Sequence, residues 1–286
     1  MTLADVLVAE PAKRLAAVQA DLTYIVPQAA KPRFLSQAYT GGAHVFEFET
    51  EQHRVEITDL RPVADLFTLD HEGFAFRNHH SAVQDFYDDA QIEHIYSREI
   101  QEFVAREFGA SSVYVFDVTR RSDAKTGAAN KDGARGTASR IHVDYTAKSG
   151  PKRFRDVAGD AQADRILASG ARVVQINVWR PIKGPVQSSP LALADASTVH
   201  GDDLIATDQV FPDRIGEIYH LAYNPGQRWY YAPAMEPHET FLIKGWDSLA
   251  DGRAQFTPHT AFNQVDPDPN AAARESIEVR TYAVID

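Results

Sequence analysis

The chain has 286 residues, of which 44% are apolar and 24% are charged, a balance typical of a folded globular protein and not of a disordered or collagen-like one. It contains no cysteine, which excludes disulfides, zinc-thiolate sites and thiol nucleophiles. Its formal net charge of −11 argues against a general binder of nucleic acids or of anionic membranes.

The first residues do not predict a membrane anchor. The start, MTLADVLVAEPAKRL, carries Asp5 and Glu10 within its apolar stretch, and no uncharged apolar run approaches the ~20 residues that span a bilayer. We therefore expect a cytoplasmic protein. Because no linker rich in proline, glycine or serine divides the chain, we expect a single domain over residues 1–286, in which residues 1–110 pack on a core formed by residues 111–286.

Short elements are predicted along the first 110 residues. Residues 43–59 alternate apolar and polar side chains around a break at Glu51-Gln52-His53, which predicts two strands joined as a hairpin. Residues 81–108 place apolar side chains at helical spacing, with Ser81 as the N-cap and Gly109 just past the end. One or two amphipathic helices are expected there.

Strands dominate the prediction for the rest of the chain. Residues 111–119 form a strong strand, residues 160–168 a short helix that ends at Gly170, and strands punctuated by proline and glycine follow to the C-terminus. Early helices followed by many short strands predict an α+β protein with a β-sandwich or barrel core.

Residues 119–155 form a basic segment in an acidic chain. They hold ten basic and three acidic residues, a net charge of +7, so the remainder of the chain carries −18. Residues 120–140 also have few apolar side chains, and a loop of that length inside a compact domain is usually a lid or is disordered. One interpretation is a solvated loop; the other is a mobile lid whose charge attracts an anionic substrate or 2-oxoglutarate to the site.

The pentapeptide Ile141-His142-Val143-Asp144-Tyr145 carries the first two residues of a predicted metal site. On a strand, side chains two residues apart share a face, so His142 and Asp144 point the same way. Two such ligands form most of a 2-His-1-carboxylate facial triad, which leaves open positions on Fe(II).

His259 is predicted to complete this triad, followed by a carboxylate-binding pair at Arg274 and Ser276. Arg274 can hold the distal carboxylate of a metal-chelating 2-oxo acid through its planar fork, and Ser276 adds a donor from the same strand face. His220 and His238 are the other histidines that follow Asp144 on strand-like sequence, but they lie farther from Arg274 than the 15 residues that separate it from His259. Arg280 shares the strand face of Arg274 and is an alternative carboxylate binder.

This ordered set resembles the iron(II)/2-oxoglutarate dioxygenase superfamily, and longer phrases are similar to its CmcJ/AsaB-type hydroxylase/desaturase family of secondary metabolism. The phrases are HVDYT, NVWRPIKGPV, PLALAD, RWYYAPAMEPHETFLIKGWDS, PHTAF and RESIEVR, within residues 55–283. The resemblance implies a double-stranded β-helix (jelly roll), and Fe(II), 2-oxoglutarate and O₂ for oxidation of an unactivated C–H bond of a small molecule. The sequence around His259 resembles the family's His-Thr/Ser-Ala-Phe element.

Asn177 is a further candidate in the strand of residues 171–180. Gln175, Asn177 and Trp179 share one face, and the interior of a jelly roll that holds a metal is expected to be polar, so Asn177 is a candidate partner for 2-oxoglutarate or substrate. The alternative is that this face meets solvent.

Two other functions remain as alternatives. A jelly-roll binder or sensor without catalytic activity would carry the same residues. A methyltransferase needs a glycine-rich turn after its first strand, whereas in GASSVYVFD the glycine precedes the strand.

Overall fold

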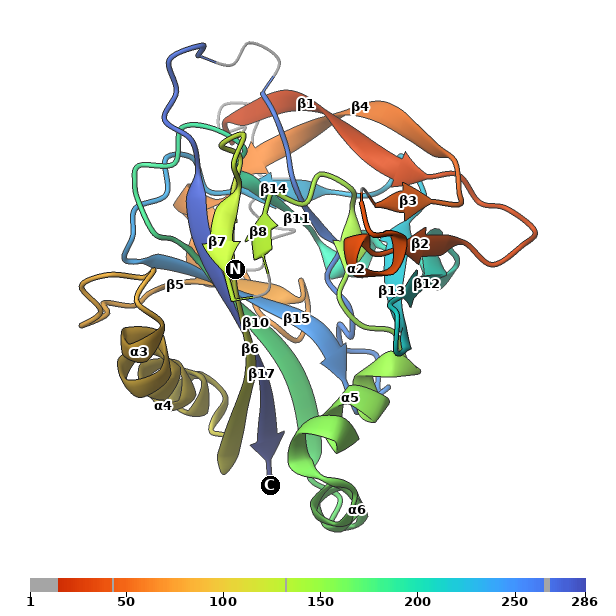
Figure 1. The fold of residues 1–286 in the computed structure, drawn as a ribbon, viewed down its shortest axis with the longest axis vertical. Helices are drawn as coiled ribbons and strands as arrows, with labels where there is room; N and C mark the ends of the chain where they lie inside the picture. The colour runs from red at the N-terminus through yellow and green to blue at the C-terminus, as the bar shows by residue number, and fades with distance from the viewer. Residues whose placement is uncertain (1–14, 43, 132, 265–267) are drawn as a thin grey trace.

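The computed structural model describes residues 15–42, 44–131, 133–264 and 268–286, so the predictions made on Asp5 and Glu10 lie outside the described residues. Two sheets hold most of the described strands and face one another (Figure 1). The larger sheet, with ten described strands, has the order β1 (Ala17–Ile25), β4 (Thr50–Asp59), β14 (Trp229–Tyr231), β11 (Leu191–Ala194), β16 (His259–Ala261), β9 (His142–Val143), β13 (Ile215–Leu221), β12 (Leu204–Val210), β2 (Arg33–Leu35) and β3 (Val45–Phe46).

The second sheet has five described strands. Its order is β5 (Phe74–Asn78), β15 (Glu239–Asp247), β10 (Arg172–Pro181), β17 (Glu275–Ile285) and β6 (Ser112–Ser122). The described helices are α2 (Gln37–Thr40), α3 (Asp89–Gln91), a π-helical turn (Ile92–Tyr96), α4 (Ser97–Phe108), α5 (Ser149–Ala158) and α6 (Asp160–Ala168), with single-turn or short 3₁₀ segments at Arg61–Leu66, Ala196–Thr198 and Gly201–Asp203. No helix among these is long and apolar enough to cross a membrane.

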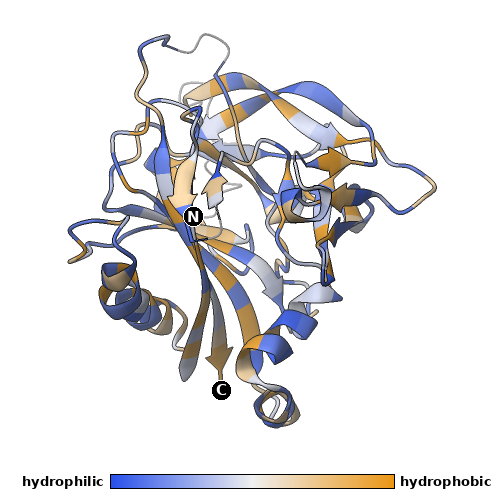
Figure 2. Ribbon diagram, in the orientation of Figure 1, coloured by the Kyte–Doolittle hydropathy of each residue, from blue (hydrophilic) through white to orange (hydrophobic). Residues whose placement is uncertain are grey.

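Strands β10 and β17 separate an apolar outer face from a polar inner face. Val174, Ile176 and Val178 of β10 pack in one cluster with Ile277 and Val279 of β17 and with the apolar side of α4. Gln175, Asn177 and Trp179 point the other way and are buried between the sheets. Figure 2 shows this alternation of hydrophilic and hydrophobic residues along the strands. The solvent-facing alternative for Asn177 is therefore wrong.

The predicted helices are present, with a different start. The helical stretch begins after Asp88, whose carboxylate accepts hydrogen bonds from the Ala90 and Gln91 amides, and ends at Gly109, which has a φ of 62°. The Ser81 N-cap is wrong, because no helix starts there: the Ser81 hydroxyl accepts from the Val83 amide in a non-helical segment and donates to Glu99. The helix over residues 160–168 is confirmed by α6.

The predicted hairpin over residues 43–59 is also wrong. Strand β4 runs through the Glu51-Gln52-His53 break and pairs with β1 in antiparallel register, from Ala17 opposite Thr58 to Ile25 opposite Thr50. Strand β3 pairs with β2. The partner of β4 is therefore β1, whose paired residues lie 25 or more positions upstream, and not the adjacent segment. Strand periodicity alone does not specify which strand becomes the partner.

The basic segment has more regular structure than the sequence suggested. Strand β6 extends to Ser122, the hairpin of β7 (Ala128–Asn130) and β8 (Gly133–Arg135) follows, and α5 occupies residues 149–158. The mobility of this segment stays a prediction.

A buried ion cluster fixes the segment that leads to His259. The ammonium of Lys244, on β15, has no exposed surface and donates to Asp70, Asp247 and the Ala254 carbonyl, each at 2.9 Å. Its three donors are therefore all satisfied. Next to it, Thr257 donates to the Gly73 carbonyl at 2.7 Å. Gly73 has a φ of 84°, and a Cβ there would lie 2.3 Å from the Thr257 hydroxyl, so only glycine fits.

Lys244→Met should lower the free energy of unfolding by about 3 kcal/mol, because it removes one of the two described cations, Lys244 and Arg172, that pair with the buried carboxylate of Asp247. Chemical denaturation measures this loss. Arg98→Ala, which removes an exposed pair with Glu102 on α4, is the control and should cost about 0.5 kcal/mol or less. Equal losses in the two variants would contradict a stabilising role for the buried cluster.

Candidate functional site

The predicted histidines and Asp144 meet between the two sheets. His142 on β9 lies opposite His259 on β16 in the antiparallel register, and their ring centroids are 4.6 Å apart. The Nε2 atom of His142 lies 3.8 Å from an Asp144 carboxylate oxygen. Strand register therefore brings together three residues that are separated by up to 117 positions in the sequence.

Both histidines are oriented so that Nε2 is available. The Nδ1 atom of His142 lies 2.9 Å from the Arg140 carbonyl, and that of His259 lies 3.0 Å from the Thr257 carbonyl. A carbonyl accepts only from N–H, so each ring carries its proton on Nδ1 and presents the Nε2 lone pair to the interior. Metal-binding histidines are commonly held in this way. Burial lowers the pKa of His142 to about 3, which keeps the ring neutral and able to bind a metal.

Asp144 is held by residues of the opposite sheet. The guanidinium of Arg280, on β17, donates to both of its carboxylate oxygens at 3.2 Å, and the Asn177 side-chain amide donates to one of them. Burial by itself would raise the pKa of Asp144, but the charge of Arg280, together with smaller contributions from His142, His259 and the Asn177 hydrogen bond, outweighs it. The pKa therefore lies below its ordinary value and the group is a carboxylate, the form that binds a cation.

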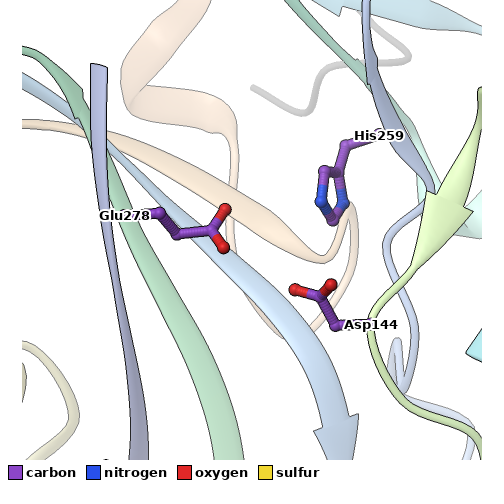
Figure 3. Close-up of side chains that lie close together, drawn as sticks. All are labelled: Asp144, His259 and Glu278. Carbon is purple, nitrogen blue, oxygen red and sulfur yellow. The ribbon is translucent and has the colours of Figure 1, made fainter. Parts of the chain in front are cut away.

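Glu278 is a member of the site that the sequence analysis did not name. Potential ligand atoms of Asp144, His259 and Glu278 all lie within 4.8 Å of one another, and Figure 3 shows the three side chains pointing toward one another from the two sheets. Glu278 also forms an ion pair with Arg280, whose Nη2 atom lies 2.8 Å from Glu278 Oε1. The signal was present in the sequence, because positions 274, 276, 278 and 280 share one strand face.

Arg274 lines the same cavity as His142 and His259, together with Arg121 and Trp179. It is 3% exposed, yet none of the described residues forms an ion pair with it. Its guanidinium donates to the Ser189 carbonyl and lies over the Trp179 ring, while Nε has no hydrogen-bond partner. Burial, aided by the nearby charge of Arg121, lowers its pKa to about 10, so it remains a cation.

The other predicted residues have more ordinary surroundings. Ser276 is buried and its hydroxyl lies 3.4 Å from the Arg121 carbonyl. The Asn177 amide is committed to Asp144 and accepts from Gln175, so a direct contact with a bound acid stays a prediction.

The two alternative histidines lie in different places. His220, on β13, is opposite His142 on the side away from His259, and its Nδ1 lies 3.0 Å from the Thr207 hydroxyl. His238 stacks on His80, with ring centroids 5.2 Å apart, and both line a separate groove that contains neither His142 nor His259.

The arrangement has the donor set of a divalent metal site. Two imidazole nitrogens and one carboxylate on rigid strands leave several positions of an octahedral ion open to exogenous ligands. A buried arginine with an unpartnered Nε, in the same cavity, fits the carboxylate of such a ligand.

Comparisons with known proteins agree with this chemistry. Residues 22–284 match a family model described as an oxidoreductase/YMDC permease-like domain. The hydroxylase/desaturase efuI of Hormonema carpetanum is 31% identical over 84% of this chain and 86% of its own length, and asaB of Aspergillus flavus is 43% identical over 42% of this chain and 57% of its own length.

A solved structure has the same fold. The iron and alpha-ketoglutarate-dependent endoperoxidase NvfI superposes with a TM-score of 0.82 at 25% identity, covering 94% of this chain and 98% of that chain. The predicted double-stranded β-helix with flanking helices is thereby confirmed, as is the resemblance to the hydroxylase/desaturase family.

His142→Ala should weaken binding of Mn(II), a redox-stable probe, by more than about 100-fold, since it removes a ligand. Glu278→Gln should change the affinity by no more than about threefold, because the donor set of His142, Asp144 and His259 is complete without it. Electron paramagnetic resonance of free Mn(II) in a titration measures both. His220→Gln is the matched control, because His220 is the cross-strand neighbour of His142 on the side away from His259, and the affinity of this variant for Mn(II) should equal that of the wild type. A loss in Glu278→Gln as large as in His142→Ala would make Glu278 a ligand.

Proposed function

The chain belongs to the family of Fe(II)/2-oxoglutarate-dependent hydroxylases and desaturases, and we propose that it oxidises an unactivated C–H bond of a small molecule in secondary metabolism. The observation that carries the proposal is the convergence of two free Nε2 atoms and one carboxylate in a cavity that also contains a buried arginine without an ion-pair partner. Hydroxylation, desaturation and ring closure are all within this reaction class.

His142, Asp144 and His259 would hold the iron. The backbone carbonyls of Arg140 and Thr257 fix the two imidazoles in the tautomer that binds metal, and Arg280 with Asn177 orients the carboxylate. When bound, Fe(II) with 2-oxoglutarate and O₂ supplies an oxidant strong enough to remove hydrogen from an unactivated carbon, at the cost of decarboxylating the 2-oxo acid.

Arg274 would bind the distal carboxylate of 2-oxoglutarate, with Ser276 beside it. The guanidinium fork can make two charge-assisted hydrogen bonds to a carboxylate, and such an ion pair satisfies the Nε donor that lacks a partner. Trp179 packs under the guanidinium and limits its movement. Arg280 is less suited to this task, because Asp144, Asp117 and Glu278 already surround it.

The surroundings of Arg140 support the proposal that the substrate is anionic. It precedes His142 by two residues, lies 3.6 Å from the centroid of the Phe46 ring, and contacts no carboxylate within the described part of the chain. Burial lowers its pKa, and its Nε has no hydrogen-bond partner. Phe34 and Phe48 lie around Phe46. A substrate with a carboxylate on an apolar or aromatic body fits this combination of cation and rings.

Anaerobic addition of 2-oxoglutarate to the Fe(II)-loaded protein should produce a visible charge-transfer absorption. His259→Ala should lose the absorption, while the control His238→Ala should keep it, because His238 stacks on His80 outside the cavity. Arg274→Ala should raise the 2-oxoglutarate concentration at half-saturation by about 30-fold, the equivalent of about 2 kcal/mol for a lost charge-assisted pair.

Two outcomes of this titration would change the assignments. If Arg280→Ala weakens 2-oxoglutarate binding and Arg274→Ala does not, the carboxylate site lies at Arg280. If His238→Ala loses the absorption and His259→Ala keeps it, the ligand is His238. Succinate formation under air then separates an oxygenase from a binder without catalytic activity, because only the former consumes 2-oxoglutarate.

Arg140→Gln should abolish the preference for anionic substrates. In a screen of ring-bearing carboxylic acids paired with their methyl esters, we expect the wild type to form succinate faster with the acids. The difference should shrink as ionic strength rises, since salt screens the attraction to the basic segment. Equal stimulation by acids and esters in the wild type would exclude the anionic substrate class.

A further inference from the structure

A solvent-open groove of about 620 Å³ lies on the outer face of the five-stranded sheet, between the C-terminal end of β10, the loop before α3 and the start of β15. Figure 1 shows α3 and α4 on this side of the sheet. The groove is separate from the metal cavity. Arg180 lines the groove, whereas its neighbour Trp179 on β10 points to the opposite face and lines the cavity.

Arg180 is a buried cation without a counter-charge. Its side chain is 3% exposed, and in the described part of the chain no carboxylate lies within ion-pair distance of it. Its neighbours are uncharged: it donates to the Pro237 carbonyl and to Nδ1 of His79, its guanidinium lies near the rings of Phe86 and Tyr96, and its Nε has no hydrogen-bond partner. An unpaired buried charge is costly, and an unsatisfied donor adds to the cost. A ligand that supplies an oxyanion would remove both penalties.

His79 does not compensate this charge. Burial, with a further contribution from Arg180, lowers the pKa of His79 to about 4, so the ring is neutral near pH 7 and can accept the hydrogen bond at Nδ1. Glu99, the nearest acid on α4, is engaged by Ser81 and the Ala82 amide. Asp85, an exposed acid of the groove, accepts from the Tyr87 amide.

The rest of the groove provides aromatic rings and a lysine at the rim that is paired with Glu275. Phe86 lies with its ring 5.3 Å from the Arg180 guanidinium, and His80 and His238 form a parallel stack at the rim. Lys183 is 71% exposed and shares Glu275 with the Tyr87 hydroxyl. An apolar or aromatic ring can therefore pack on Phe86 or on the stacked histidines while an oxyanion reaches Arg180.

We propose that this groove binds a small molecule that carries an oxyanion, a carboxylate or a phosphate, on an aromatic or apolar ring. Arg180 is the anchor, through its planar fork, and Lys183 assists electrostatically at the rim. The site is distinct from the one that serves the proposed oxidation, and it does not depend on that proposal.

Calorimetric titration of the metal-free protein tests the site with four probes: phenyl phosphate, benzoate, inorganic phosphate and benzyl alcohol. We expect saturable binding with one site for phenyl phosphate or benzoate, weaker binding of inorganic phosphate, and none of benzyl alcohol. Whichever of the two ring-bearing anions binds more tightly identifies the preferred oxyanion. Absence of saturable binding by all anions, or equal binding of benzyl alcohol, would overturn the proposal.

Variants locate the binding. Arg180→Lys, which keeps the charge but loses the fork, should weaken the ring-bearing anion at least tenfold. Lys183→Glu, at an exposed position that does not endanger folding, should weaken it at least fivefold, while the matched control Arg98→Glu on α4 should stay within twofold of the wild type. Arg274→Ala should leave it unchanged. Loss of binding in Arg274→Ala together with unchanged binding in Lys183→Glu would assign the anion to the metal cavity and refute the groove.

Discussion

The contact of Arg280 with Asp144 is the interaction on which the interior of the protein depends. Arg280 lies on β17 of the five-stranded sheet and Asp144 follows β9 of the other sheet, so their two hydrogen bonds span the space between the sheets. The same guanidinium also pairs with Asp117 and Glu278. The two shielded carboxylates of Asp144 and Glu278 and the half-exposed one of Asp117 would repel one another, and the single cation among them reduces that cost. The orientation of Asp144 toward His142 and His259 follows from this bridge.

The polar groups occupy only part of the space between the sheets, and apolar clusters on both faces of the five-stranded sheet supply the hydrophobic stabilisation. The aliphatic side chains of β10 and β17 pack on the outer face with α4, and Phe154 of α5 and Ile166 of α6 pack with Trp246 and Tyr282 at one end of the sheet. These clusters hold the strands in place without contributing to the chemistry. The inner face is then free to carry Asn177, Glu278, Arg280 and Arg274. One strand can pack on the core with one face and carry polar site residues on the other, because successive side chains of a β-strand point to opposite faces.

Local patterns in the sequence predicted single elements well and their partners poorly. The strand over β10, the helix α6 and the end of α4 at Gly109 all follow from periodicity and glycine placement. The hairpin over residues 43–59 failed because the partner of β4 is β1, which lies across a long connection. Ser81 failed as an N-cap because the helical stretch starts only after Asp88. The hairpin was thus missed through a strand partner distant in sequence, and the N-cap through a helix start that apolar periodicity does not specify.

For the candidate site, the sequence by itself determined the residue types and their faces. The spacing of His142 and Asp144 fixes a shared strand face, and the alternation from Arg274 to Arg280 places four polar side chains on one side of β17. Only the tertiary structure decided which faces meet. Strand register placed His142 between His259 and His220. The opposing sheet supplied Arg280 and Asn177 as partners of Asp144 and brought Glu278 beside it. Arg274 and Arg180 became buried without a carboxylate partner among the described residues. The physical reason is that strand period is a property of the local backbone, whereas register, burial and electrostatic compensation arise from contacts between segments far apart in the chain.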